Sequence, residues 1–264
     1  MSPTFTDLQR ELRLSNSLRA LGGMRAAAMP FRVHRGLSEP TLLRLRKHDM
    51  AVNLWVQDRS HLIAIEEVLG NDIYAEPPLQ DPKLIVDLGS NIGASVMYFK
   101  TRYPDVEMVA VEADPASFDL LRKSTERLPG VTVYQAAVGV SGETVRFARS
   151  ADSIGSSAVA LDVGTDVIDV PRVQLDDLIA GREVDLLKID IEGSEFEVLP
   201  AANLSTVRRI VGELHLGPNT TLDPDMAELL PGFDVRILDV YTDPPGVWSE
   251  LRNFVAVQTQ FAQA

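Results

Sequence analysis

The segment Lys83-Leu-Ile-Val-Asp-Leu-Gly-Ser-Asn-Ile-Gly-Ala-Ser-Val-Met-Tyr-Phe-Lys100 decides the fold of this chain of 264 residues. Its opening residues, 83–88, form a short apolar run rich in β-branched side chains, which predicts a buried parallel strand. Residues 89–93 contain too much Gly, Ser and Asn to continue a strand, and residues 94–100 have the composition of a helix start. A strand, a glycine turn and a helix make the first half of a βαβ unit, in which backbone N–H groups and the helix N-terminus face a ligand.

The spacing of the glycines indicates which ligand this turn binds. A dinucleotide fingerprint needs Gly-x-Gly-x-x-Gly, whereas here Gly89 and Gly93 enclose Ser90 and Asn91, and Asp87 precedes the first glycine by two residues. The Asp-x-Gly-x-x-x-Gly pattern resembles the first motif of S-adenosylmethionine (SAM)-dependent methyltransferases, which bends the chain under the methionine end of the cofactor. The alternative is a plain tight turn that binds nothing.

The composition excludes several classes of partner. Apolar residues make up 45% of the chain and charged residues 24%, which is typical of a globular protein with ample core material. The formal net charge of −13 argues against binding to a nucleic-acid backbone or an anionic membrane. The chain has no cysteine, so disulfides, thiolate nucleophiles and cysteine-based zinc sites are excluded. Charged residues interrupt the N-terminal region, so we expect neither a signal peptide nor a transmembrane run, and a cytoplasmic location.

Residues 1–80 are predicted to form an N-terminal extension of helices and a strand, and residues 81–264 a methyltransferase domain. The apolar spacing predicts an amphipathic helix that ends at Gly22-Gly23, and Ser60 is a candidate N-cap for a later helix. Residues 24–50 hold much of the positive charge. This stretch is either a solvated face or a surface that contributes a lid, substrate contacts or homodimer contacts. Pro77-Pro78 and Asp81-Pro82 mark the boundary.

The remaining chain predicts a seven-stranded, mostly parallel sheet with interleaved helices. Glu112 ends the second strand about twenty residues past the glycine turn, where a carboxylate accepts both ribose hydroxyls of a nucleoside. A helix-capping role is the alternative, although Asp114-Pro115 already supplies the next helix start. The small residues of 136–139 leave room for an adenine ring. The strands after the first are expected at 106–111, 131–135, 184–189, 208–214, 235–238 and 254–258.

Polar side chains follow two of these strands at the edge where open α/β sheets bind ligands. Asp190 and Glu192 come directly after the strand that contains Lys188, and Glu213 and His215 end the next one. The Ser/Gly/Asp-rich loop at 150–166 is long enough to be functional.

With these pieces in place, the chain resembles the FkbM-type family of SAM-dependent methyltransferases. The string Lys188-Ile-Asp-Ile-Glu-Gly-Ser-Glu195 is the most specific match, and the matching segments span residues 83–215. The family usually has a small or hydroxyl residue where this chain has Gln174, and often an acid where it has Val140. The other matching segments are Val86–Gly93, Val111–Pro115, Ala136–Gly139 and Leu175–Leu178.

The resemblance implies a Rossmann-like class I methyltransferase fold and methyl transfer from SAM, usually to a hydroxyl of a sugar or natural product. Together with the strand positions, it indicates one cofactor-binding set. The expected residues are Asp87, Gly89, Ser90, Asn91, Gly93, Glu112, Ala113, Ala137, Val138 and Asp190.

An alcohol is a poor nucleophile while it is protonated, and a general base typically contributes about 10²–10⁴-fold. His215 is the candidate base, because it alone among the four histidines follows a core strand. An unperturbed imidazole has a pKa near about 6.5 and is largely neutral at neutral pH. The alternative is a structural histidine that is hydrogen-bonded to Glu213. We interpret His34, His48 and His61 as surface or packing residues.

Three roles remain open for the acids beside His215. Asp190 and Glu192 could orient the substrate hydroxyl while Lys188 neutralises one of them. Alternatively, Asp190, Glu213 and His215 could bind a divalent metal such as Mg²⁺, which lowers the pKa of the alcohol. In the third case Lys188 only forms an ion pair that holds the loop.

The leading hypothesis is therefore a SAM-dependent O-methyltransferase that acts on a small hydroxylated acceptor. The alternative is a SAM-binding or regulatory protein without catalysis of its own. An NAD-dependent dehydrogenase is disfavoured, because the central glycine of its fingerprint is missing.

Overall fold

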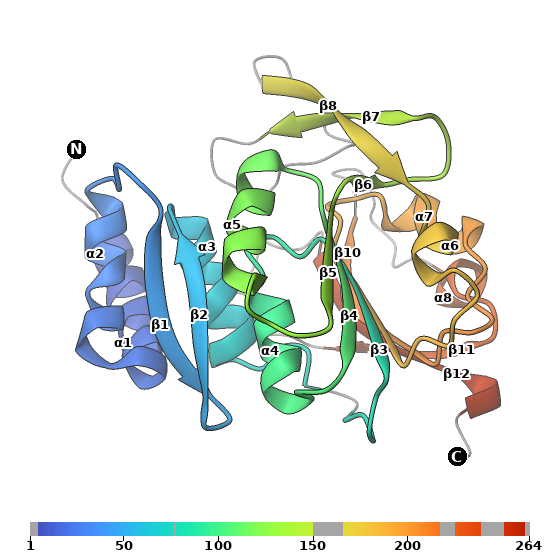
Figure 1. Ribbon diagram of the computed structural model, residues 1–264, viewed down its shortest axis with the longest axis horizontal. Helices are drawn as coiled ribbons and strands as arrows, with labels where there is room; N and C mark the ends of the chain where they lie inside the picture. The colour runs from blue at the N-terminus through green and yellow to red at the C-terminus, as the bar shows by residue number, and fades with distance from the viewer. Residues whose placement is uncertain (1–4, 76–77, 150–165, 217–224, 239–250, 262–264) are drawn as a thin grey trace.

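A computed structural model describes residues 5–75, 78–149, 166–216, 225–238 and 251–261 (Figure 1). The segment that opens the sequence analysis forms β3, Leu84–Leu88, and α4, Ala94–Arg102. All five residues of β3 are buried at the centre of a seven-stranded sheet of order β11-β12-β10-β9-β3-β4-β5. The other strands are β4 Glu107–Glu112, β5 Val131–Gln135, β9 Leu186–Ile189, β10 Arg209–His215, β11 Phe233–Leu238 and β12 Leu251–Gln258.

The topology confirms the predicted Rossmann-like class I methyltransferase fold. Counted along the chain, the strands lie in the order 3-2-1-4-5-7-6. Strands β5, β4, β3, β9 and β10 are mutually parallel, and β12 runs antiparallel to both of its neighbours. The strand order reverses at β3: β4 and β5 follow on one side of it, and β9 and β10 lie on the other side. A ligand-binding crevice is therefore expected at the carboxyl ends of β3 and β9. Leu88 pairs with Val111 on one side and Ile189 on the other, which brings the three strand ends level.

Helices cover both faces of the sheet and bury alternate residues of its strands. Ile85 belongs to a hydrophobic cluster with residues of α4 and of α5, Pro115–Thr125. Val86 faces the opposite way, into a cluster with residues of α6, Leu175–Ile179, α7, Glu195–Ala201, and α8, Met226–Leu229. Figure 1 shows α4 and α5 on one side of the sheet and α6, α7 and α8 on the other.

The N-terminal extension packs outside α4 and α5. It shares their hydrophobic cluster, in which Leu18 and Leu54 lie with Met97. One local prediction is wrong: the side chain of Asp58, rather than that of Ser60, caps α3. The predicted helix end at Gly22-Gly23 is confirmed as a break within α1, because Gly23 has a non-helical backbone (φ +68°, ψ −160°) and a second helical segment follows it. The elements are α1 Phe5–Ala27, α2 Met29–His34, β1 Thr41–Lys47, β2 Met50–Val56, α3 Arg59–Ile65 and the π-helix η1 Glu66–Gly70.

A second sheet lies beside the main one (Figure 1). It has the order β6-β8-β7, with β6 Ala137–Val138, β7 Thr144–Arg149 and β8 Asp166–Val173. Apart from its last residue, the predicted functional loop at 150–166 lies outside the described residues. The last described element is the 3-10 helix η2, Thr259–Phe261. Among the described residues, we find no helix with the length and apolar character needed to cross a membrane.

Candidate active site

The turn after β3 is held from both sides. The N–H groups of Gly89 and Ser90 each donate to the carbonyl of Val111 in β4 at 2.9 Å. From β9, Nζ of Lys188 donates to the carbonyl of Gly89 at 2.6 Å. Gly89 has φ +75°, and a Cβ atom there would overlap the carbonyl oxygen of Asp190. Position 89 therefore requires glycine, both for its backbone conformation and for the close approach of β9.

The buried, charged side chains of Asp87 and Lys188 stabilise this turn. Asp87 has no exposed surface; its Oδ2 accepts a hydrogen bond from the Ser95 hydroxyl at 2.5 Å, and its Oδ1 lies 3.3 Å from Nζ of Lys188. Nζ of Lys188 also lies 3.5 Å from Oδ2 of Asp190. Burial alone would lower the pKa of Lys188, but the charges of Asp87 and Asp190 raise it. The expected ion pair with Asp190 is present, and Lys188 links the ends of β3 and β9.

Glu112 ends β4 with its carboxylate at the same turn. Its Oε2 accepts the N–H of Asn91 and its Oε1 accepts the N–H of Asp114, both at 2.8 Å. Burial raises the pKa of Glu112 to about 7, while the two backbone hydrogen bonds and the charge of Lys188 oppose the rise. Each carboxylate oxygen has a second lone pair, so Glu112 can still accept hydrogen bonds from a ligand.

A pocket opens between this turn, the end of β9 and the small sheet. Within the described part of the chain, Oδ1 of Asn91 is buried without a hydrogen-bond partner, which suits a ligand that offers a donor. Asp87, Ser90 and Gly93 are absent from the lining and lie in the turn and its support. The other seven residues of the predicted set do line it: Gly89, Asn91, Glu112, Ala113, Ala137, Val138 and Asp190.

The sequence analysis did not identify Phe147, Ile191 or Ser194 as lining residues. Ile191 and Ser194 belong to the 188–195 string, which offered a signal. Phe147 lies in β7, where no motif marks it, and it reaches the pocket because the small sheet places it there. The lining fits a nucleoside that carries a positive charge, because it combines the carboxylate of Glu112 with small residues at 136–138 and the carboxylates of Asp190 and Glu192.

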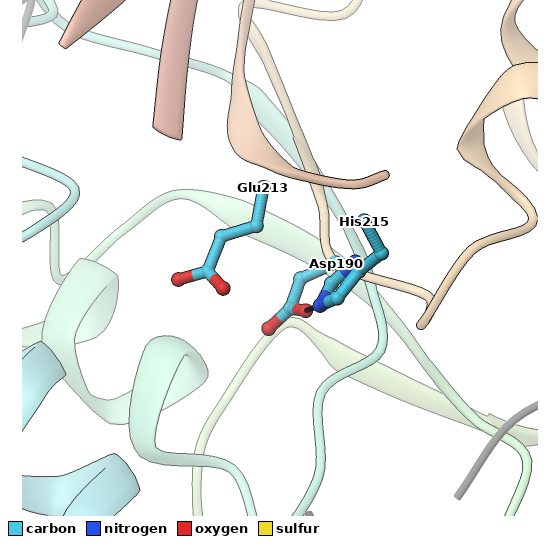
Figure 2. Close-up of side chains that lie close together, drawn as sticks. All are labelled: Asp190, Glu213 and His215. Carbon is cyan, nitrogen blue, oxygen red and sulfur yellow. Dashed lines mark ion pairs between the residues drawn. The ribbon is translucent and has the colours of Figure 1, made fainter. Parts of the chain in front are cut away.

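His215 lies among carboxylates at the edge of this pocket. Its Nδ1 is 3.1 Å from Oε1 of Glu195, and its Nε2 is 3.4 Å from Oε2 of Glu192 and 3.8 Å from Oδ1 of Asp190. Figure 2 shows Asp190, Glu213 and His215 converging from two strand ends, and one candidate ligand atom from each lies within 4.8 Å of the others. The hydrogen-bond partner of Nδ1 is thus Glu195, and not Glu213 as the structural alternative supposed.

The charges around His215 change its protonation. Burial alone would lower its pKa, but the hydrogen bond to Glu195 and the charges of Asp190, Glu195 and Glu192 outweigh burial and raise it to about 10. The expectation of a neutral imidazole is therefore wrong for the free protein, in which His215 is protonated at neutral pH. Burial and the charge of Asp190 raise the pKa of Glu213 well above its usual range.

Two residues of the N-terminal extension also lie near this edge. Tyr74 is 5% exposed, and its ring centroid is 5.6 Å from Nζ of Lys188. Glu67 lies in η1. Its burial, and to a smaller extent the charge of Asp190, raise its pKa to about 7. No motif marks either residue, because their proximity to Asp190 depends on packing across more than a hundred residues of chain.

Comparisons with known proteins identify the chain's family. A model of the methyltransferase FkbM domain matches residues 87–237. "Methyltransferase 1" of Beauveria bassiana is 28% identical over 159 residues, which cover 51% of this chain and 64% of that protein. "Hexuronic acid methyltransferase AglP" of Haloferax volcanii is 27% identical over 157 residues, 57% of this chain and 62% of the relative. The matches to these two relatives therefore span less than two thirds of the relatives' length.

A third relative is "31-O-demethyl-FK506 methyltransferase FkbM" of Streptomyces tacrolimicus. It is 27% identical over 174 residues, which cover 52% of this chain and 67% of that protein. The domain match covers more than half of the chain and includes both the turn after β3 and the strand ends that carry Asp190 and His215. The chain belongs to the FkbM family of methyltransferases.

Proposed function

We propose that the protein is a SAM-dependent O-methyltransferase for a small hydroxylated acceptor. The observation that carries this proposal is that one pocket is lined both by Glu112, at the end of β4, and by Asp190, which follows β9. His215, at the end of β10, lies beside Asp190. The name of the Streptomyces tacrolimicus relative describes methylation of an oxygen, which supports an oxygen acceptor here.

Each part of the pocket has a role in this proposal. Glu112 and the turn at Gly89 and Asn91 would hold the nucleoside, and Ala137 and Val138 would flank its base. When bound, SAM supplies a methyl group that is electrophilic because its sulfur is a sulfonium. Asp190 and Glu192 orient the acceptor hydroxyl. Holding two reactants in attack geometry can be worth effective molarities of about 10⁵–10⁸ M, so much of the catalysis is positioning.

His215 is the proposed acceptor of the hydroxyl proton, at Nε2. This nitrogen faces Glu192 and Asp190, both of which line the pocket. In the free protein Nε2 already carries a proton, because the pKa of His215 is about 10. A positive charge bound beside Asp190 and Glu192 lowers that pKa, since it competes for the same carboxylates.

A divalent metal is the second candidate, favoured by the convergence of Asp190, Glu213 and His215. Because the pKa of Glu213 is raised by burial and by the charge of Asp190, a cation would bind this carboxylate by displacing its proton, as metal ions do at protonated ligands. Oxygen ligands with one imidazole suit Mg²⁺ or Mn²⁺, which would lower the pKa of a bound alcohol.

The charge of the acidic edge also bears on the acceptor. The four carboxylates of Asp87, Asp190, Glu192 and Glu195 outnumber the two positive charges of Lys188 and His215 beside them. The resulting net negative charge disfavours an anionic ligand. We therefore propose that the acceptor is neutral or cationic near the methylated hydroxyl, unlike the hexuronic acid named for the Haloferax volcanii relative.

The test is methyl transfer from labelled SAM to a panel of hydroxylated acceptors, with and without Mg²⁺ and EDTA. We expect a neutral sugar or polyketide alcohol to gain one methyl group, and uronic acids to be poorer acceptors. Activity that EDTA abolishes and Mg²⁺ restores would favour the metal over His215 as a base. SAM binding without transfer to any acceptor in the panel would support the non-catalytic alternative.

A further inference from the structure

Glu195 is a buried carboxylate behind His215. It is the first residue of α7 and has no exposed surface. Its Oε1 accepts the N–H of Ile191 at 2.9 Å and lies 3.1 Å from Nδ1 of His215, and its Oε2 accepts the N–H of Gly193 at 2.9 Å. One carboxylate therefore joins the end of β10 to the turn after β9.

This turn has an uncommon backbone conformation. Glu192 has φ +55° and Gly193 has φ +104°, so two consecutive residues are in the left-handed region. A non-glycine residue keeps such a conformation only where its surroundings enforce it. The two hydrogen bonds to Glu195 enclose Glu192 from both sides, and they thereby set where the Glu192 carboxylate points.

The same carboxylate determines the orientation of the His215 ring. An ionised carboxylate only accepts hydrogen bonds, so Nδ1 must carry the proton that lies between it and Glu195. The role of one ring nitrogen of a histidine is set by the hydrogen bond that the other one makes. Here the other nitrogen, Nε2, faces Glu192 and Asp190 at the pocket.

We infer that Glu195 is a positioning residue for the reaction: it fixes Nε2 of His215 toward the acceptor and holds Glu192 beside it. The inference rests on the proposed function, but it holds whether His215 acts as a base or as a metal ligand. Loss of such a partner typically lowers activity by about 10–100-fold, and a misplacement of about 1 Å can cost about 10²-fold.

The first test compares Glu195→Gln with Glu197→Gln. The amide of Gln keeps one acceptor oxygen, so it cannot serve both Ile191 and Gly193 and still accept from His215. We expect kcat at saturating SAM and acceptor to fall by about 10–100-fold in Glu195→Gln. Glu197 is exposed on the same helix and should tolerate the change. An unchanged kcat in folded Glu195→Gln overturns the inference.

A double variant separates positioning from a merely structural role. If Glu195 acts through His215, Glu195→Gln should cost much less in a His215→Ala background than in the wild type. If Glu195 only stabilises the fold, the two losses should multiply. That result would contradict the inference.

A spectroscopic measurement on the wild type requires neither an active enzyme nor a variant, and folded variants extend it. In ¹⁵N spectra of the wild type, His215 should show an Nδ1-bound proton that exchanges slowly with water. The signal should persist in Glu197→Gln and disappear or exchange rapidly in Glu195→Gln. A wild-type His215 without a protected Nδ1 proton overturns the inference, even if methyl transfer is confirmed. If the Nδ1 proton is protected but no acceptor is methylated, the result would contradict the proposed function and leave the hydrogen bond between His215 and Glu195 confirmed.

Discussion

Replacing His215 by alanine should lower kcat for methyl transfer by about 10²–10⁴-fold, the usual contribution of a general base. His215 is absent from the pocket lining, so the dissociation constant for SAM should change little. The pH dependence should change as well. Since Nε2 must lose its proton before it can accept one, the wild-type rate should rise with pH, and this limb should disappear in His215→Ala. Single-turnover rates over a pH series measure both effects.

His34→Ala is the matched control, because His34 is exposed in α2, far along the chain from the site. It should keep the wild-type rate and pH profile. If His215→Ala kept the full rate on the true acceptor, the assignment of the base would be wrong, and Asp190 or Glu213 would have to take that role.

Replacing Gly89 by alanine should destabilise the protein and abolish SAM binding. The left-handed backbone at φ +75° costs a non-glycine residue roughly 1–2 kcal/mol, and the overlap with the Asp190 carbonyl adds about 1–3 kcal/mol of overpacking. The turn can relieve this overlap only by moving away from β9, which displaces the groups that line the pocket. Thermal unfolding and calorimetric titration with SAM measure the two losses.

Gly181→Ala provides the matched control for this change. Gly181 has φ +71°, but a Cβ atom there would meet no atom within 4 Å. It should therefore lose only the backbone contribution, about 1–2 kcal/mol, and bind SAM like the wild type. If the two variants were equally stable and both bound SAM, the close approach of β9 to the turn would be contradicted.

The centre of the fold could be predicted because its signals are local. Residues 83–100 specify β3, the glycine turn and α4 through apolar runs and glycine spacing alone. The break at Gly23 was predicted from a local signal too, since glycine adopts the left-handed backbone that interrupts a helix. The error at α3 occurred because a nearby residue competed for the same role: Asp58 accepts the N–H of His61 and so caps the helix in place of Ser60.

The site was predictable only in part. Glu112, Asp190 and His215 could be placed because they follow predicted strands, and the ends of parallel strands meet at one edge. The pKa of His215 could not be predicted from the sequence, because it depends on three carboxylates, one of which comes from α7. Glu67 and Tyr74 come from the N-terminal extension, and only the packing of η1 beside α4 brings them near Asp190.

The most direct test of the account is calorimetric titration of SAM into the wild type and Glu112→Gln. We expect one nucleoside per chain, and an affinity about 10- to 100-fold weaker in the variant, since hydrogen bonds to a charged group contribute about 1.5–3 kcal/mol. Because the pKa of Glu112 is about 7, the wild-type affinity should fall as the pH is lowered through that value. Glu143→Gln, an exposed change, should bind like the wild type. No heat with the wild type, or equal affinity for wild type and Glu112→Gln, would contradict the account.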